Sequence, residues 1–250
     1  MRRAASLPVQ GLWIGERLSV MEQLSIRSFL ANGHDYHLYT YGPVAGIPEG
    51  TTVLSAVDVI PAARMWRYAD HDSYAGFSNH FRYKLLLERG GIWADCDVVC
   101  LRPLDLRPHA IASEDTDDGG VQRASCFLAA PAGSALMRRA VEICEGSDVR
   151  TLKWGDTGPK LLTRLVEELG FRFAVLPTRA FCPVPHQRYT ELVSADTATQ
   201  WRSRARLQGA QAVHLWHELW RRSGLDASAA YPPGCIYERL KRRYGLADGS

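Results

Sequence analysis

The segment from Ser78 to Leu101, SNHFRYKLLLERGGIWADCDVVCL, constrains the fold and chemistry of this chain more than any other. Its first half has an amphipathic pattern that predicts a short helix, which Gly90 and Gly91 then end. The apolar run that follows predicts a strand carrying Asp95 and Asp97 two residues apart. Because side chains at i and i+2 on a strand point to the same side, we expect the two carboxylates to be presented together.

Two carboxylates presented together favour a hard cation. Proteins bind Mg²⁺ or Mn²⁺ through one or two carboxylates, and water and substrate phosphates take the remaining positions. A purely structural role explains the pair poorly, because Asp is disfavoured inside strands and Trp93, Val98 and Val99 flank it here. The pattern therefore predicts a Mn²⁺ or Mg²⁺ site and a phosphorylated substrate, in the simplest case a nucleotide diphosphate.

Strands and helices alternate along the rest of the chain. Apolar runs predict strands at Val9–Ile14, Tyr36–Tyr41, near Val53, and at Ile111–Ser113, Ser125–Ala129 and Phe171–Leu176. Helical periodicity predicts one helix in the segment after Ile14 that ends at Ala31, and two more at Ser134–Cys144 and Pro159–Leu169. The alternation predicts an α/β fold with a mostly parallel central sheet flanked by helices and sites at the carboxyl ends of the strands. The 250 residues show no linker or internal repeat, so we expect a single domain over residues 1–250.

Charge and cysteine content exclude several classes of protein. The 30 basic and 27 acidic residues are spread along the chain, so we expect no nucleic-acid partner. The six cysteines occur singly, without a Cys-x-x-Cys pair, which predicts reduced, buried thiols rather than a disulfide framework or a zinc site.

Membrane-spanning and export signals are also lacking. The N-terminal residues MRRAASLPVQ have no apolar stretch of the signal-peptide kind, and no apolar run is long enough to span a bilayer. We therefore expect a cytoplasmic protein without a transmembrane segment. The basic run Glu238–Tyr244 (ERLKRRY) leaves peripheral contact with the inner membrane face open, although such runs are more often plain helix surface.

The run from Ser78 to Pro103 resembles the core of the glycosyltransferases whose sugar-binding region contains an Asp-x-Asp motif. That family includes the capsular-polysaccharide, yeast initiating-mannosyltransferase and globotriaosylceramide-synthase types, and it is distantly similar to the clostridial glucosylating toxins. In the family an Asp-x-x-Arg helix precedes a Gly-Gly-aromatic-x-Asp-x-Asp strand, and the strand here reads GGIWADCD from Gly90 to Asp97. Weaker similarities lie at Leu12–Gly15 (LWIG), Trp154–Pro159 (WGDTGP) and His214–Trp216 (HLW).

The resemblance implies a GT-A fold and a metal-dependent enzyme. Such an enzyme moves a sugar from a nucleotide-diphosphate donor, with a UDP-sugar favoured and a GDP-sugar open, to a hydroxyl of a glycan, lipid-linked or protein acceptor, with retention of configuration. The resemblance assigns Asp97 to direct binding of the cation and Asp95 to the ribose or to the cation through water. His214 is the implied third ligand, with core packing as its alternative, and His217 is a weaker candidate.

Further donor contacts are implied in the helix before the aspartates. Asn79 and Arg82 lie three apart and share a helix face, and the planar fork of Arg82 suits hydroxyls and phosphates. The alternative for Arg82 is an ion pair with Glu88 or Asp95. Asn79 stands where the family has Asp, and an amide accepts weaker hydrogen bonds than a carboxylate, so donor choice or rate is expected to differ.

The remaining candidates carry two interpretations each. In the related toxins, the equivalent of Trp13 and Gly15 stacks on uracil, whereas a tryptophan ending a first strand is usually core. Tyr41 and Trp93 are further donor-binding candidates, again with core packing as the alternative. Asp156 is the candidate catalytic residue, holding the transferred sugar or acting on the acceptor, and its alternative is to cap the helix that begins at Pro159.

Two other functions remain open at this point. One is a phosphatase of the haloacid dehalogenase type, whose nucleophile motif is also an apolar strand ending in Asp-x-Asp-x-Val, although no convincing acidic pair follows Lys153 and Lys160. The other is a nucleotide-sugar-binding relative that has lost catalysis, which the Asn79 departure motivates.

Overall fold

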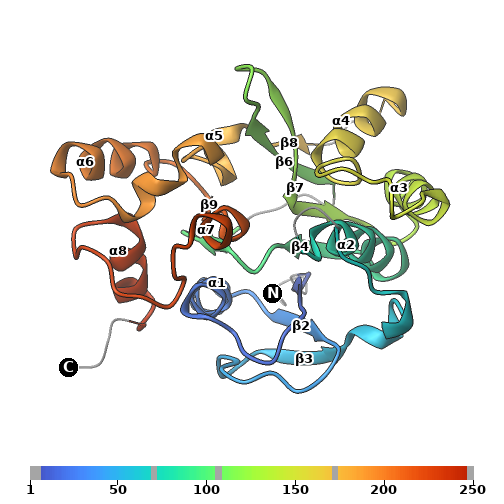
Figure 1. The fold of residues 1–250 in the computed structure, drawn as a ribbon, viewed down its shortest axis with the longest axis horizontal. Helices are drawn as coiled ribbons and strands as arrows, with labels where there is room; N and C mark the ends of the chain where they lie inside the picture. The colour runs from blue at the N-terminus through green and yellow to red at the C-terminus, as the bar shows by residue number, and fades with distance from the viewer. Residues whose placement is uncertain (1–6, 69–71, 105–108, 171–173, 247–250) are drawn as a thin grey trace, which may run out of the picture.

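The computed structural model describes residues 7–68, 72–104, 109–170 and 174–246 (Figure 1). Within those residues the main sheet has seven strands in the order β3-β2-β1-β4-β7-β6-β8. Their bounds are β1 Val9–Trp13, β2 Tyr36–Thr40, β3 Thr52–Ser55, β4 Gly91–Ala94, β6 Ala110–Asp115, β7 Val121–Ala130 and β8 Ala174–Val175. A separate ribbon pairs β5 (Val98–Cys100) with β9 (Ala212–His214).

The strands β3, β2, β1 and β4 are mutually parallel, β8 is parallel to β6, and only β7 runs antiparallel to both its described neighbours, β4 and β6. The predicted α/β fold with a mostly parallel central sheet is therefore confirmed. Parallel neighbours place their carboxyl ends at one edge, so the ends of β1, β2 and β4 lie together there.

Helices cover both faces of the sheet. They are α1 Val20–Ala31, α2 Ala75–Arg89, α3 Ala135–Gly146, α4 Pro159–Glu168, α5 Thr178–Phe181, α6 Thr197–Arg206, α7 His217–Ser223 and α8 Ile236–Arg243, with 3₁₀ turns at Ala56–Asp58, Ala62–Arg64 and His186–Val193. Within the described residues, none of these helices is both long and apolar enough to cross a membrane.

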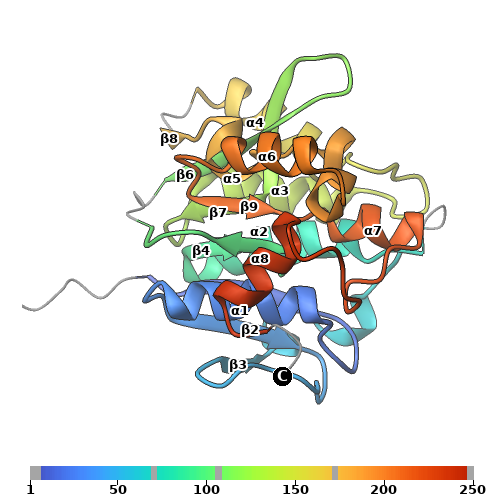
Figure 2. The same cartoon turned by 90° about the vertical axis from the view of Figure 1, so that its left-hand side faces the viewer.

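Two hydrophobic cores result, one on each face of the sheet. On β4, Trp93 packs into the core made with α2, α3 and α4, while Ile92 and Ala94 join the core made with α1 and the ribbon. This alternation follows from the two-residue repeat of a strand. Figure 2 shows the ribbon, α6 and α8 on the side of the molecule opposite to α3. All six cysteines are buried and none forms a disulfide, as the sequence predicts.

The prediction that a strand carries both aspartates is wrong, because the strand ends before them. β4 ends at Ala94, and residues 95–97 form a turn in which the amide of Val98 donates to the carbonyl of Asp95 at 2.9 Å. The reason is that β4 pairs with β1 and β7 in the main sheet, whereas β5 pairs with β9 in the ribbon. The chain has to leave one sheet for the other between the two aspartates.

Several other predicted boundaries shift. The strand that we expect at Ser125–Ala129 begins at Val121, and the helix expected from Ser78 begins at Ala75. Of the predicted strand Phe171–Leu176, residues 171–173 lie outside the described residues and Ala174–Val175 is a strand. The segment before Gly76, for which the sequence predicts nothing, contains the first two 3₁₀ turns.

Gly90 gives a test of the connection that leads into β4. Its backbone has φ 66° and ψ −167°, a region that only glycine adopts readily, and an added Cβ would lie 2.5 Å from the amide nitrogen of Ala132. We expect Gly90→Ala to lower the free energy of unfolding by about 3 to 5 kcal/mol.

Gly33→Ala is the matched control, measured beside it by urea denaturation. Gly33 also has a positive φ, of 81°, but nothing lies within 4 Å of a Cβ built there. We expect a loss of about 1 to 2 kcal/mol for this change. Equal losses in the two variants would contradict the idea that close backbone approach constrains Gly90.

Candidate active site

A cavity of about 220 Å³ opens at the carboxyl ends of β1 and β4. Its walls come from five segments of the chain: Leu12–Ile14 at the end of β1, Glu22 of α1, Ser73–Ala75 with Ser78 and Arg82 of α2, Asp95–Asp97, and His217 with Glu218 of α7. The sequence-predicted residues Trp13, Arg82, Asp95 and Asp97 thus meet at one cavity.

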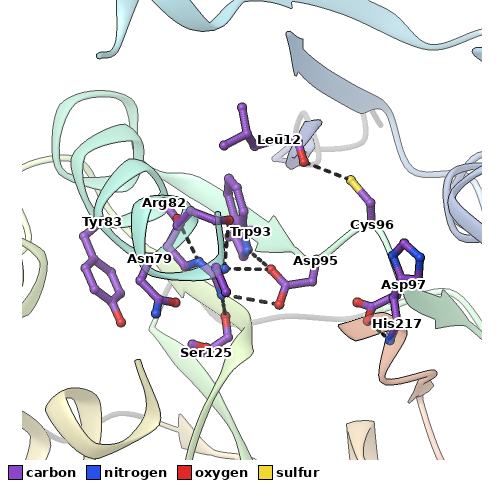
Figure 3. Close-up of polar contacts among 12 residues, drawn as sticks. Leu12, Asn79, Arg82, Tyr83, Trp93, Asp95, Cys96, Asp97, Ser125 and His217 are labelled. Atoms are coloured by element: carbon purple, nitrogen blue, oxygen red, sulfur yellow. Dashed lines mark hydrogen bonds and ion pairs between the residues drawn. The ribbon is translucent and has the colours of Figure 1, made fainter. Parts of the chain in front are cut away.

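The turn after β4 presents both carboxylates to this cavity. Between them, Cys96 points the other way, toward the carbonyl of Leu12 at 3.4 Å and the hydroxyl of Tyr36 at 3.7 Å (Figure 3). The side chains of Asp95 and Asp97 remain 24% and 13% exposed. The two carboxylates therefore lie side by side, as expected, but on a turn rather than on a strand. The middle residue of the turn is anchored in the core.

Asp95 is held by the guanidinium of Arg82. One Arg82 nitrogen lies 3.1 Å from Oδ1 of Asp95 and the other 3.4 Å from Oδ2, and the indole of Trp93 donates to Oδ1 at 2.8 Å (Figure 3). Burial raises the pKa of Asp95, the charge of Arg82 opposes that rise, and the neighbouring Asp97 adds to it. The ion pair left open as an alternative for Arg82 is present.

Arg82 itself is almost fully buried, with 4% of its side chain exposed. It donates to the carbonyl and hydroxyl of Ser78 at 3.1 and 3.0 Å and to the carbonyl of Ser125, and its guanidinium lies 4.9 Å from the ring centroid of Trp93. Such a number of contacts fixes the rotamer of Arg82 and so the orientation of Asp95.

Asp97 is bound from the opposite direction by the C-terminal part of the chain. Its Oδ2 lies 3.2 Å from Nε2 of His214 and accepts a 2.8 Å hydrogen bond from the backbone amide of His217. Burial alone would raise the pKa of Asp97, but His214 and the amide of His217 outweigh it and lower the pKa to about 2. The carboxylate is therefore ionised at neutral pH.

His214 belongs to two groups of potential metal ligands, one fully buried and one partly exposed. Burial lowers its pKa, but Asp97 and Cys126 outweigh this and hold the pKa well above its ordinary value. Its ligand atoms lie within 4.8 Å of those of Asp95 and Asp97, and equally of those of Cys126 and Cys182. Two carboxylates that face the cavity and one imidazole are a donor set that suits a hard divalent cation, so these residues fit the predicted metal.

Glu22, which the sequence did not predict, and His217, a weaker candidate, complete the cavity wall. Glu22 is completely buried, its pKa is raised by burial, and its Oε1 lies 3.1 Å from Nδ1 of His217. The ring of His217 stacks on Trp13, with the centroids 6.3 Å apart and the planes at 16°. The sequence signals only the capping box of Ser19 and Glu22, which the structure contains, and not the contact of Glu22 with the cavity.

Other predicted site residues lie away from the cavity walls. Tyr41 donates to the carbonyl of Ile60 at 2.8 Å and packs in the core, and Trp93 is 1% exposed. Asn79 is buried against Thr157, with its amide nitrogen 3.4 Å from the hydroxyl. Gly15 lies beneath the indole of Trp13, where a Cβ would be 3.1 Å from Nε1. Their roles in donor binding stay predictions.

Asp156 lies in the turn before α4 and does not line the cavity. Its Oδ2 accepts from the amide of Lys153 at 2.8 Å, and its Oδ1 lies 3.5 Å from Nζ of Lys160. The N-cap of α4 is Gly158, without a side-chain cap, so the alternative interpretation of Asp156 as the helix cap is wrong. Its catalytic role stays a prediction.

The fold of this chain is similar to that of solved glycosyltransferase structures. Solved structures with a similar fold include an active-site mutant of LgtC, which has a TM-score of 0.52 and 13% identity and covers 98% of this chain and 97% of that one. Another is the bifunctional glycosyltransferase WbbM, with a TM-score of 0.52 and 11% identity over 99% of this chain and 51% of that one. The fold is that of the GT-A glycosyltransferases.

Sequence comparison defines the class further. Residues 57–116 match the glycosyltransferase sugar-binding region containing the DXD motif, and residues 133–245 match the alpha 1,4-glycosyltransferase conserved region. Both matched regions are glycosyltransferase regions, and this chain is therefore similar to glycosyltransferases in two separate segments. Lactosylceramide 4-alpha-galactosyltransferase of Mus musculus is 27% identical over 184 residues, which is 67% of this chain; the match spans 46% of the mouse protein. These matches favour a glycosyltransferase over the haloacid dehalogenase alternative.

Arg82 gives a test of how the site is held together. Lysine retains the charge but cannot bind Asp95, Ser78 and Ser125 at once, so we expect Arg82→Lys to lower the free energy of unfolding by about 2 to 4 kcal/mol. Arg89→Lys on the same helix is the control, since Arg89 has one hydrogen bond, to the hydroxyl of Tyr39. It is expected to cost about 0.5 kcal/mol. Similar urea midpoints for both variants would demote Arg82 to an ordinary helix residue.

Proposed function

We propose that this chain transfers a sugar from a nucleotide-diphosphate donor to an acceptor hydroxyl and that it depends on Mn²⁺ or Mg²⁺. The observation that carries the proposal is the group formed by Asp95, Asp97 and His214, whose ligand atoms lie within 4.8 Å of one another beside the cavity. The first two belong to the segment that matches the DXD sugar-binding region. Asp97 and His214 are proposed to bind the cation directly.

The cavity offers separate surfaces for the two ends of a donor. When bound, the cation offsets the negative charge that develops on the leaving diphosphate. Trp13 and the ring of His217 form an aromatic surface at the end of β1 that suits the base, which by resemblance is uracil. Arg82 acts as a positioning residue, because its contacts hold Asp95 toward the donor.

The mouse relative suggests the first donor to test. Its name describes transfer of galactose to lactosylceramide in an α-1,4 linkage. UDP-galactose is therefore the favoured donor, with GDP-sugars as the comparison, and retention of configuration is part of the proposal. Donor binding can be measured by thermal shift with and without Mn²⁺, since a ligand at a hundred times its dissociation constant adds about 2.7 kcal/mol of stability.

Asp97→Asn tests the role of the cation. An amide is a far weaker ligand for a hard cation than a carboxylate, so we expect transfer to be lost and UDP binding to become insensitive to Mn²⁺ and to chelator. The change also removes the ion pair with His214, and we expect about 1 to 3 kcal/mol of lost stability in a chain that still folds.

Asp58→Asn is the control, because Asp58 is an exposed residue of the 3₁₀ turn after β3. It should keep both transfer and the effect of Mn²⁺ on UDP binding. If Asp97→Asn bound UDP with the same dependence on Mn²⁺ as the parent, the assignment of Asp97 would fail.

Asn79→Asp tests whether the site is altered or inactive. Asn79 contacts Thr157, and Gly158 lies so close that a Cβ there would be 2.9 Å from the Asn79 amide nitrogen. If Asn79 reaches the donor, the carboxylate should strengthen a hydrogen bond to a sugar hydroxyl by roughly 1 kcal/mol and change donor affinity about fivefold.

The comparison of parent and variant has three outcomes, read from donor affinity and from sugar transfer. A changed affinity supports a donor contact. Transfer by the variant alone would identify the parent as an inactive relative. No change in either measurement would show that Asn79 only packs α2 against the loop that leads into α4.

A further inference from the structure

A second and larger cavity lies on a different part of the molecule. It is a groove of about 630 Å³ between α6, α8 and the residues that follow β5. α6 packs against α8, and Figure 2 shows both helices on the face turned toward the viewer. The lining comes from three stretches of chain, so the groove is a product of the fold rather than of one basic run.

Among the residues that the structure describes, five arginines line this groove and no acidic residue does. They are Arg102, Arg204, Arg239, Arg242 and Arg243. Among the described residues, no carboxylate lies within ion-pairing distance of any of them. Elsewhere arginines do pair, as Arg139 does with Glu142 at 3.0 Å. The acid of α8, Glu238, is bound to Lys241 at 2.8 Å.

Ordinary structural roles explain only part of this cluster. Arg243 donates to the carbonyl of Leu101 at 2.8 Å, and Arg242 donates to the carbonyl of Pro233. Both lie in the last turn of α8, where cations interact favourably with the helix dipole. Arg102 and Arg239 have no such explanation, because they make no hydrogen bond or ion pair with any described residue. Arg102 and Arg239 are both exposed residues.

The groove also has an apolar component. Leu101, Leu207 and Ile236 are among its lining residues. Trp201, three residues before Arg204 on α6, is 70% exposed, which is the largest exposed fraction among the large hydrophobic side chains described. Positions three apart share a helix face, so this indole lies on the same side of α6 as Arg204. A ligand suited to the groove therefore carries negative charge and an apolar part.

The groove is distinct from the candidate active site. Asp97 precedes β5, whereas Leu101 and Arg102 follow it, so the two sites lie at opposite ends of that strand. Four residues of extended chain span roughly 13 Å. None of the residues that line the groove lines the cavity at Asp97.

We propose that the arginine groove binds a ligand with two or more phosphate groups next to an apolar segment. Planar guanidinium groups bind phosphate oxygens in pairs, and five of them in one groove can neutralise several negative charges. Either a phospholipid surface or a soluble polyphosphate presents this chemistry. We expect the groove to prefer phosphate groups to carboxylates. The main reason is that a phosphate offers more oxygens to each guanidinium, and the difference in charge matters less.

The test uses the full chain and two probes. Inorganic tripolyphosphate is titrated by calorimetry, and vesicles of phosphatidylcholine with and without an equal part of phosphatidylglycerol are used in co-sedimentation. We expect binding to at least one probe and a roughly tenfold or greater loss of affinity in the double variant Arg102→Gln, Arg239→Gln. Binding to phosphatidylglycerol vesicles alone identifies a membrane surface, and binding to tripolyphosphate identifies the phosphate groups themselves; both support the proposal.

The control is the double variant Arg138→Gln, Arg164→Gln, which makes the same change in net charge on α3 and α4, at the other end of the molecule (Figure 1). It should bind both probes as the parent does. The proposal is overturned if neither probe binds, if the control loses as much affinity as the groove variant, or if a polyglutamate peptide competes as well as tripolyphosphate. UDP binding with Mn²⁺, measured on the same samples, shows whether the active site is independent of the groove.

Discussion

The site depends on the contacts that the carboxylate of Asp97 makes with the imidazole of His214 and the backbone amide of His217. They join the turn after β4 to a segment about half the chain away. The pairing of β5 with β9 sets their register, since Val98 faces His214 and the amide of Leu215 donates to the carbonyl of Asp97 at 2.9 Å. The C-terminal part of the chain therefore forms one wall of the cavity rather than an appendage to the sheet.

Two carboxylates next to each other in a partly buried site need separate partners. Asp95 has the guanidinium of Arg82, and Asp97 has the imidazole of His214, so each carboxylate has a partner of its own. The cost of burying these charges is offset by hydrogen bonds from Trp93 and from the His217 amide. The pKa directions reflect the difference between the two environments: that of Asp95 is raised, whereas that of Asp97 is lowered.

Local sequence was sufficient for the parts of the fold that local interactions decide. The amphipathic helix and the Gly-Gly break follow from periodicity and turn chemistry, and the structure has both. The turn at Asp95–Asp97 was not predictable in this way, because it exists only where the chain leaves the main sheet after β4 so that β5 can pair with β9. The contact of Glu22 with His217 depends on the same long-range packing, as does the position of Asn79 against Thr157.

Trp216 shows how the packing around Asp97 is achieved. It adopts φ 62° and ψ 46°, a left-handed conformation that is unfavourable for a bulky residue by roughly 1 to 2 kcal/mol. This corner ends β9 and begins α7, and it directs the amide of His217 at Asp97. The indole donates to the carbonyl of Val184 at 2.9 Å, and its ring lies 3.9 Å from that of His214. The unfavourable backbone conformation and the two site histidines thus occur within four consecutive residues, so the geometry around Asp97 is maintained at a cost in backbone energy that the surrounding contacts offset.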